Sequence, residues 1–178
     1  APVIRQGSAA NAAGLQAIIN QFRADLGGNN NGVGGTFPNG RREINWDGVP
    51  DAFAAPNVMP PDFFNVNSAR GAVFHTLLED AGSAINDFMV SANAASGTSL
   101  RFGNINPSYT STFIANSDQR LFMPLGAHAM LVRFYQPGGT TQATVSGFGV
   151  VFTDVDSSTG AGRTIIFTYA PDGRQLVA

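Results

Sequence analysis

From Arg41 onward the sequence alternates between short apolar runs and clusters of turn-forming residues, and this alternation limits the fold more than any other feature. Four runs are especially rich in aromatic and β-branched residues, which favour strands. These runs cover residues 119–125, 128–137, 143–153 and 163–170. Weaker candidate strands cover residues 41–46, 69–76, 87–92, 99–105 and 111–115. Many short strands separated by turns predict a mainly β fold, an antiparallel β-sandwich of the jelly-roll type.

The turns between these runs are explicit in the sequence. Gly, Pro, Asp and Ser gather at 137–139, at 157–162 and at 171–173. The last of these clusters predicts a hairpin at the C-terminal end of the sequence. Residues 77–88 fit no strand pattern clearly, and a short helix is the alternative there.

One amphipathic helix is expected before the β region. Five apolar residues spaced three or four positions apart would form a single stripe along it: Leu15, Ile18, Ile19, Phe22 and Leu26. Ser8 is the expected N-cap, and the Gly27–Gly28 pair ends the helix. We expect the stripe to dock on the rest of the chain. The helix and the Gly/Asn-rich connector after it make up residues 1–40, and residues 41–178 form the β-sandwich domain.

Composition limits the compartment and the partners. The net charge of −2 and the scattered arginines give no basic patch for nucleic acid. No apolar run reaches the roughly 18 residues that span a bilayer. Cysteine is absent, which excludes disulfides and zinc–thiolate sites. The Ala-Pro start is typical of a chain after removal of a signal peptide, so we expect a secreted protein, extracellular or at the cell surface.

Two acidic segments predict a calcium site. Asn45, Asp47 and Asp51 surround a Gly and a Pro in one segment, and Asp154 and Asp156 end a predicted strand in the other. Calcium takes six to eight oxygen ligands, which Asp, Asn and loop carbonyls supply. If the two segments met, their carboxylates would surround one ion. The alternative is that Asp47 and Asp51 shape turns, while Asp154 and Asp156 are solvated charges at a strand end.

Catalytic patterns are sparse. The two histidines, His75 and His128, lie in apolar surroundings, and Ser146 lacks the glycine spacing of a nucleophile elbow. A secreted hydrolase acting on polysaccharide or ester would draw on these histidines together with Glu43 and Asp47.

An aromatic and amide cluster offers a sugar-binding alternative. Phe63, Phe64, Asn65 and Asn67 follow two prolines, and such residues on the rim of a sandwich would stack on and hydrogen bond to a sugar. The competing interpretation is that the rings close the end of the core and the amides bind loop backbone.

Several longer strings are similar to those of a known group of proteins. The strings are GRREINWDGVPDAF, PPDFFNVNSARGAVF, FGNINPSY, QRLFMPLG and GFGVVFTDVD, which occur in this order between residues 38 and 156. In them the chain resembles a family of uncharacterised secreted bacterial proteins, some of which carry a C-terminal PEP-CTERM sorting signal. The resemblance implies export and a surface or matrix location, and it implies no enzymatic activity.

The sequence therefore predicts a non-catalytic extracellular binding or structural module stabilised by Ca²⁺, with Asn45, Asp47, Asp51, Asp154 and Asp156 as ligands. Its expected partners are extracellular polysaccharide or copies of itself. Two alternatives stay open, a secreted hydrolase and a self-assembling surface or matrix subunit.

Overall fold

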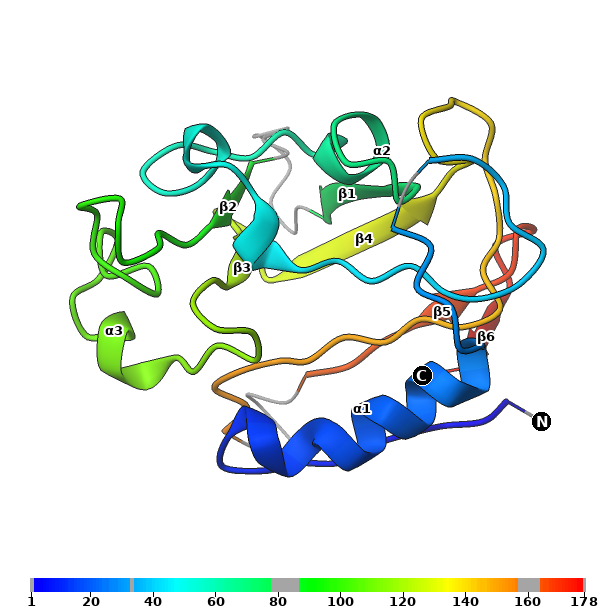
Figure 1. Cartoon of the computed structure of the whole chain (residues 1–178), viewed down its shortest axis with the longest axis horizontal. Helices are drawn as coiled ribbons and strands as arrows, with labels where there is room; N and C mark the ends of the chain where they lie inside the picture. The colour runs from blue at the N-terminus through cyan, green and yellow to red at the C-terminus, as the bar shows by residue number, and fades with distance from the viewer. Residues whose placement is uncertain (1, 33, 78–86, 157–163, 178) are drawn as a thin grey trace.

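Short strands and short helices alternate around an aromatic core in the computed structural model, which describes residues 2–32, 34–77, 87–156 and 164–177 (Figure 1). The helices are α1 (Ala12–Leu26), η1 (Trp46–Gly48), η2 (Asp51–Phe53), α2 (Phe63–Val66) and α3 (Tyr109–Thr112). The strands are β1 (Ala72–Leu77), β2 (Phe88–Val90), β3 (Phe122–Pro124), β4 (Ala129–Phe134), β5 (Thr168–Tyr169) and β6 (Gln175–Val177).

The strands form three separate antiparallel pairs. β1 pairs with β4 in a register that sets His75 opposite Leu131, β2 pairs with β3, and β5 pairs with β6. The expected C-terminal hairpin is confirmed, because the Gly173 amide donates to the Ala170 carbonyl at 2.9 Å within the turn that joins β5 and β6. The expected antiparallel pairing is thus present, while the described residues form small two-stranded sheets and show no closed sandwich.

Several predicted strands take other conformations. Residues 99–105 form a tight turn, because Arg101 and Phe102 have φ values of 50° and 64° in the left-handed region. In the 41–46 run, Arg41 makes only an isolated bridge with Asn30 of the connector. Most of the ambiguous 77–88 stretch lies outside the described residues.

The largest predicted strand, residues 143–153, leaves the sheet at its first residue. The Ala143 amide donates to the Phe134 carbonyl at 2.9 Å and so continues β4 across its turn. Beyond that bond the chain turns away from β4 and runs as a long, extended path between α1 and β4 (Figure 1). It ends at Asp154, whose φ of 59° breaks the extended conformation.

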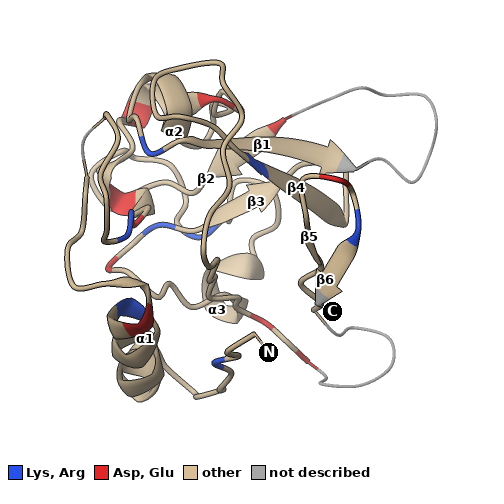
Figure 2. Cartoon of the chain, turned by 90° about the vertical axis from the view of Figure 1, so that its right-hand side faces the viewer, with Lys and Arg blue, Asp and Glu red and all other residues tan. Residues whose placement is uncertain are grey.

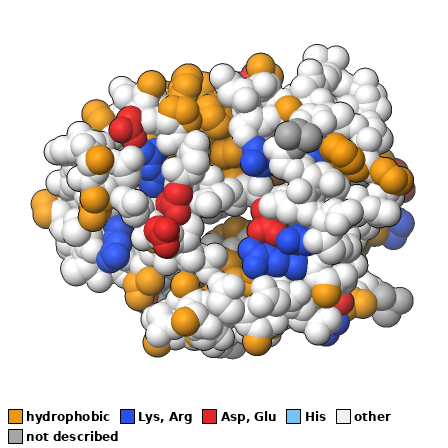
Figure 3. Space-filling view, in the orientation of Figure 1, with side chains coloured by type: hydrophobic (Ala, Val, Ile, Leu, Met, Phe, Trp, Pro, Cys, Tyr) orange, Lys and Arg blue, Asp and Glu red, His pale blue; other side chains and the backbone are white. Residues whose placement is uncertain are grey.

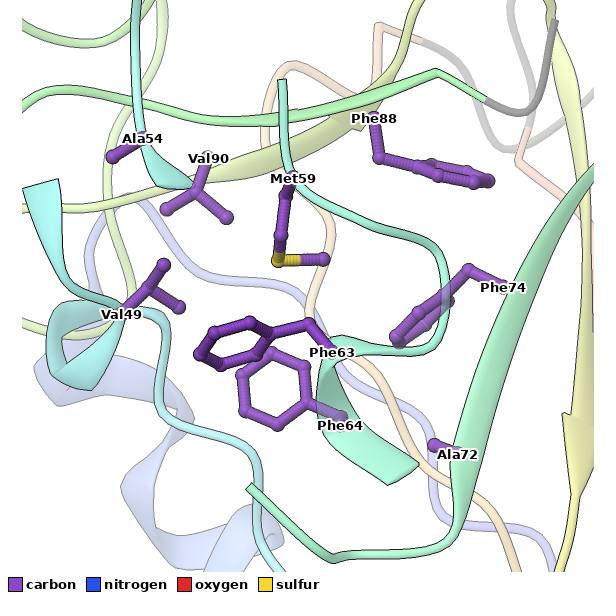
Figure 4. Packing of buried hydrophobic residues seen from close by; sticks show 9 residues of the cluster. All are labelled: Val49, Ala54, Met59, Phe63, Phe64, Ala72, Phe74, Phe88 and Val90. Atoms are coloured by element: carbon purple, nitrogen blue, oxygen red, sulfur yellow. The ribbon is translucent and has the colours of Figure 1, made fainter. Parts of the chain in front are cut away.

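Aromatic side chains fill the core between α2 and the strand pairs. Phe63 and Phe64 of α2 lie next to each other beneath Met59, and Phe74 and Phe88 approach from β1 and β2 (Figure 4). All five are buried. The core therefore fixes α2, β1 and β2 relative to one another.

Helix α1 packs on the extended 143–153 segment through its apolar stripe, all five members of which are half-buried. Two glycines make the close approach possible: a Cβ at Gly149 would lie 2.6 Å from Cε1 of Phe22, and one at Gly147 would lie 2.6 Å from Cδ2 of Leu26. The expected docking of the stripe on its own chain is thus observed. Among the described residues, no helix is long and apolar enough to cross a membrane.

Only the C-terminal end of α1 matches the sequence prediction. Gly27 ends the helix with a φ of 106°, as expected for a glycine stop. The N-cap is Asn11, whose side chain accepts a hydrogen bond from the Gly14 amide at 3.1 Å. Ser8 lies outside the helix because Asn11, three residues later, caps the first turn in its place.

Candidate functional site

Asp47, the first predicted calcium ligand, receives three backbone hydrogen bonds. Its oxygens accept from the amides of Asp118 at 2.9 Å, Gln119 at 3.2 Å and Arg120 at 2.7 Å. Asn45, the second predicted ligand, holds η1 in place, because its side chain accepts from the Asp47 amide at 3.0 Å. Consecutive backbone amides form a favourable nest for an anion, so the Asp47 carboxylate is stabilised by the loop it binds.

Asp51, the third predicted ligand, is bound by a buried arginine. Its Oδ1 accepts from Nη2 of Arg120 and from Nδ2 of Asn93, the latter at 2.9 Å. Arg120 is only 2% exposed, and its Nη1 donates to the Val49 carbonyl at 2.7 Å. Asp47, Asp51 and Arg120 together tie η1 and η2 to the loop before β3.

Sequence reasoning missed Arg120. The available signal was a charged residue at the start of an apolar strand run, beside Leu121 and Phe122. Charged residues are rarely fully buried unless they are paired, so such a position predicts an acidic partner. The partner, Asp51, is 69 residues away in sequence, and spacing gives no indication of it.

The remaining predicted ligands, Asp154 and Asp156, are exposed at the end of the 143–153 segment. The adjacent Thr153 anchors this end, since its hydroxyl oxygen accepts from the Ile114 amide at 2.9 Å. In the part of the chain that the structure describes, no group of three or more His, Asp or Glu side chains is placed to hold a metal ion. The structure thus does not gather the five predicted ligands, and the calcium site stays a prediction.

Glu43, the main hydrolase candidate, is held between two arginines. Arg23 of α1 contacts it at 2.7 Å and Arg41 at 2.6 Å. Burial alone would raise the pKa of Glu43, but the two arginine hydrogen bonds outweigh it and leave the pKa below its usual value. Glu43 therefore stays ionised and joins α1 to the segment that follows the connector, a structural role that explains both contacts.

The two histidines are on β1 and just before β4, and neither is bound to the candidate carboxylates among the described residues. Burial, followed by the charge of Arg133, lowers the pKa of His75 on β1. His128 is exposed in the turn before β4. Among the described residues no hydrogen bond joins either histidine to Glu43 or Asp47.

The aromatic and amide cluster at 63–67 faces inward. Phe63 and Phe64 belong to the core, and Asn65 is 6% exposed. The side chain of Asn65 donates to the Gly139 carbonyl at 2.9 Å and so fixes the 137–139 turn. These three residues match the structural interpretation of the cluster rather than a sugar platform.

Exposed apolar side chains gather instead near the C-terminal end of the chain. We call these eleven side chains the apolar surface. They are Val145, Phe148, Val150, Val151, Phe152, Val155, Ile165, Ile166, Phe167, Tyr169 and Leu176. Each is 38–54% exposed.

The backbone of residues 144–152, which carry the first five of these side chains, makes no hydrogen bond among the described residues, through either its N–H or its C=O groups. We call residues 144–152 the open strand. Unpaired strand backbone is a template for another strand, and native proteins usually cover or charge it.

Charged side chains, by contrast, form no patch of one sign on the face drawn in Figure 3, where arginine and acidic side chains lie in mixed groups around a hollowed centre. Along the chain, Arg and the acidic residues are scattered over many segments (Figure 2).

The chain matches no model of a protein family, and searches of curated proteins and of solved structures return no similar protein. The proposal below consequently rests on the residues themselves.

Proposed function

We propose that the protein is a non-catalytic extracellular binding or structural module that acts through contact at its apolar surface. The observation that carries this proposal is the coincidence of exposed apolar side chains with unpaired backbone in the open strand. Native proteins usually cover or charge an unpaired strand backbone, and they rarely expose many large apolar side chains together. Together the two features describe a surface that is suited to pairing with another chain.

The number of exposed apolar side chains supports the proposal. Eleven large ones, between Val145 and Leu176, are each 38–54% exposed. Exposed apolar surface beyond the ordinary amount marks interaction sites in proteins.

The arrangement of the carboxylates favours contact over hydrolysis. Glu43 binds two arginines and Asp47 binds three amides, so both carboxylates that the sequence nominated for hydrolysis have structural partners. General acid–base catalysis needs a carboxyl group that exchanges protons near the working pH. The lowered pKa of Glu43 opposes that requirement.

Three further proposals come from the sequence. Export and a surface location follow from the composition and from the resemblance to secreted bacterial proteins. The second is a closed jelly-roll sandwich, which forms only if the open strand pairs with another strand. A Ca²⁺ ion would be shared by Asn45, Asp47, Asp51, Asp154 and Asp156 if the two acidic segments met, and a melting temperature that EDTA leaves unchanged would remove this last proposal.

The dye 8-anilinonaphthalene-1-sulfonate tests the apolar surface on the folded protein. We expect saturable binding at low protein concentration, and clearly weaker binding by the double variant Val150→Asp/Phe152→Asp. Val58→Asp is the matched control, because Val58 is 47% exposed but lies outside the apolar surface. Absence of dye binding by the wild-type protein at every concentration would contradict the proposal.

A further inference from the structure

We propose that Asn39, in the connector after α1, is a site of spontaneous deamidation. The reaction converts the side-chain amide of Asn39 into a carboxylate, with water as its only co-reactant. The modification is independent of the apolar surface and of the proposed function, and it adds a negative charge to the connector.

The chemistry depends on the residue that follows the asparagine. The backbone nitrogen of that residue loses its proton and attacks Cγ of the asparagine side chain. The new N–C bond closes a five-membered succinimide ring, and the Cγ–Nδ2 bond breaks, so that ammonia leaves with the displaced proton. Water then opens the ring at either carbonyl and leaves aspartate or isoaspartate. Glycine permits the closest approach, because it has no Cβ and adopts conformations that other residues avoid.

An asparagine or aspartate precedes glycine at four places in the sequence, and all four lie within the described residues. The pairs are Asn31–Gly32, Asn39–Gly40, Asp47–Gly48 and Asp172–Gly173. A hydrogen bond donated by the glycine amide keeps the attacking nitrogen occupied, because the bond must break before the proton can leave. The contacts of each pair therefore decide which one reacts.

The two aspartate pairs are held in tight turns. The Gly48 amide donates to the Asn45 carbonyl at 3.2 Å, and the Gly173 amide donates to the Ala170 carbonyl at 2.9 Å. Both attacking nitrogens are therefore occupied.

The Asn31–Gly32 pair is held at both of its reacting groups. The Gly32 amide donates to the Asn30 carbonyl at 3.1 Å. The side chain of Asn31 donates through Nδ2 to the Asn39 carbonyl at 2.8 Å. Ring closure at Asn31 would require both bonds to open.

The Asn39–Gly40 pair is free of such bonds. Asn39 is exposed, and in the described part of the chain neither its side chain nor the Gly40 amide takes part in a hydrogen bond. The bond from Asn31 reaches the carbonyl of the peptide group between Asn39 and Gly40. A donor at that oxygen draws electron density from the peptide nitrogen and makes its proton easier to remove. The same hydrogen bond therefore protects Asn31 and favours reaction at Asn39.

The product would alter the link between the connector and the segment that follows it. The Asn31 amide donates to the Arg41 carbonyl at 2.8 Å, and the Arg41 amide donates to the Asn29 carbonyl at 2.8 Å. Isoaspartate at position 39 lengthens the backbone by one atom just before this bridge. We therefore expect the modification to weaken the bridge.

Peptide mapping by mass spectrometry, after incubation of the full chain at mildly alkaline pH, tests the proposal. Cleavage after arginine gives one peptide, residues 24–41, that contains both Asn31 and Asn39, so fragmentation compares the two sites directly. We expect the mass increase of an amide-to-acid conversion at Asn39 in the folded protein, and a rate at Asn31 that is lower by about tenfold or more. In urea the two sites should react at similar rates, because the bonds that hold Asn31 are lost.

Asn39→Gln is the test variant, because glutamine can close only a six-membered ring, which forms far more slowly. Asn57→Gln is the matched control, since Asn57 is also exposed but precedes the β-branched Val58. The first variant should remove most of the mass increase in the 24–41 peptide, the second should leave it unchanged, and circular dichroism checks that both fold. Equal rates at Asn31 and Asn39 in the folded protein, no conversion of Asn39, or an undiminished increase in Asn39→Gln would overturn the proposal.

Discussion

At the scale of single residues, Arg120 is the one charged residue that is buried among those the structure describes. Its guanidinium is buried and bonds the Val49 carbonyl and Asp51, while its amide binds Asp47. Arg120 thus ties the 47–51 segment to the loop before β3. Asp51 has a side chain that is 58% exposed, so water can solvate that end of the ion pair, whereas Val49 has no such substitute.

We expect Arg120→Met to lower the free energy of unfolding by about 2–4 kcal/mol, because it leaves the buried Val49 carbonyl unpaired and removes the partner of Asp51. Urea denaturation measures the change. Arg174→Met is the matched control, since the side chain of Arg174 is 70% exposed and its pair with Asp172 spans 4.0 Å. An exposed pair of this kind contributes about 0–1 kcal/mol. Equal losses in the two variants would contradict the role of Arg120.

At the scale of elements, the contact between α1 and the open strand depends on two glycines. Gly149 lies so close to the ring of Phe22 that a side chain here fits only if the ring, the helix or the strand moves. Gly147 and Gly149 therefore determine how closely α1 can pack on the open strand.

We expect Gly149→Ala to destabilise the fold by about 1–3 kcal/mol, because the new methyl group would overlap Phe22 at 2.6 Å. Gly48→Ala is the control: nothing lies within 4 Å of the added atom. Urea denaturation of both variants provides the comparison. Little change in Gly149→Ala, or an equal change in Gly48→Ala, would show that the helix does not pack there.

The same elements show what sequence reasoning can predict. The stripe of α1 is a local pattern, and the helix was predicted together with its glycine stop and its docking. The runs that became β1 and β4 were also recognised, because pairing between them buries the aromatic face that the pattern predicts. Residues 143–153 have equal β propensity, but their pairing depends on how α1 packs against Gly147 and Gly149. That contact joins distant parts of the chain, and propensity does not encode it.

The candidate site was harder to predict than the elements. Asp47 and Asp51 were selected as ligands because carboxylates near turns can bind calcium, and the structure gives both of them protein donors. Those donors come from the 118–120 loop and from Asn93, at least 42 residues away in sequence, so only the folded chain reveals them. The open strand carried a sequence signal, but the absence of a partner within the described chain is a tertiary property.

At the scale of the whole molecule, the charged groups and the apolar groups have separate tasks. Glu43, Asp47 and Asp51 join segments within the chain, whereas the apolar surface is exposed around the open strand. Under the proposed function, we expect contact through backbone pairing and apolar burial, with little dependence on salt. The central claim is that residues 144–152 form an extended strand whose backbone is free in the isolated chain.

Amide hydrogen exchange in dilute solution, where the chain is monomeric, tests this claim most directly. We expect the amides of residues 144–152 to exchange at nearly the rate of an unfolded chain, because no hydrogen bond holds them. The amides of β1 and β4 should be protected under the same conditions and serve as the internal reference. Protection of residues 144–152 equal to that of β4 in the monomer would contradict the account, since the strand would then be paired within its own chain.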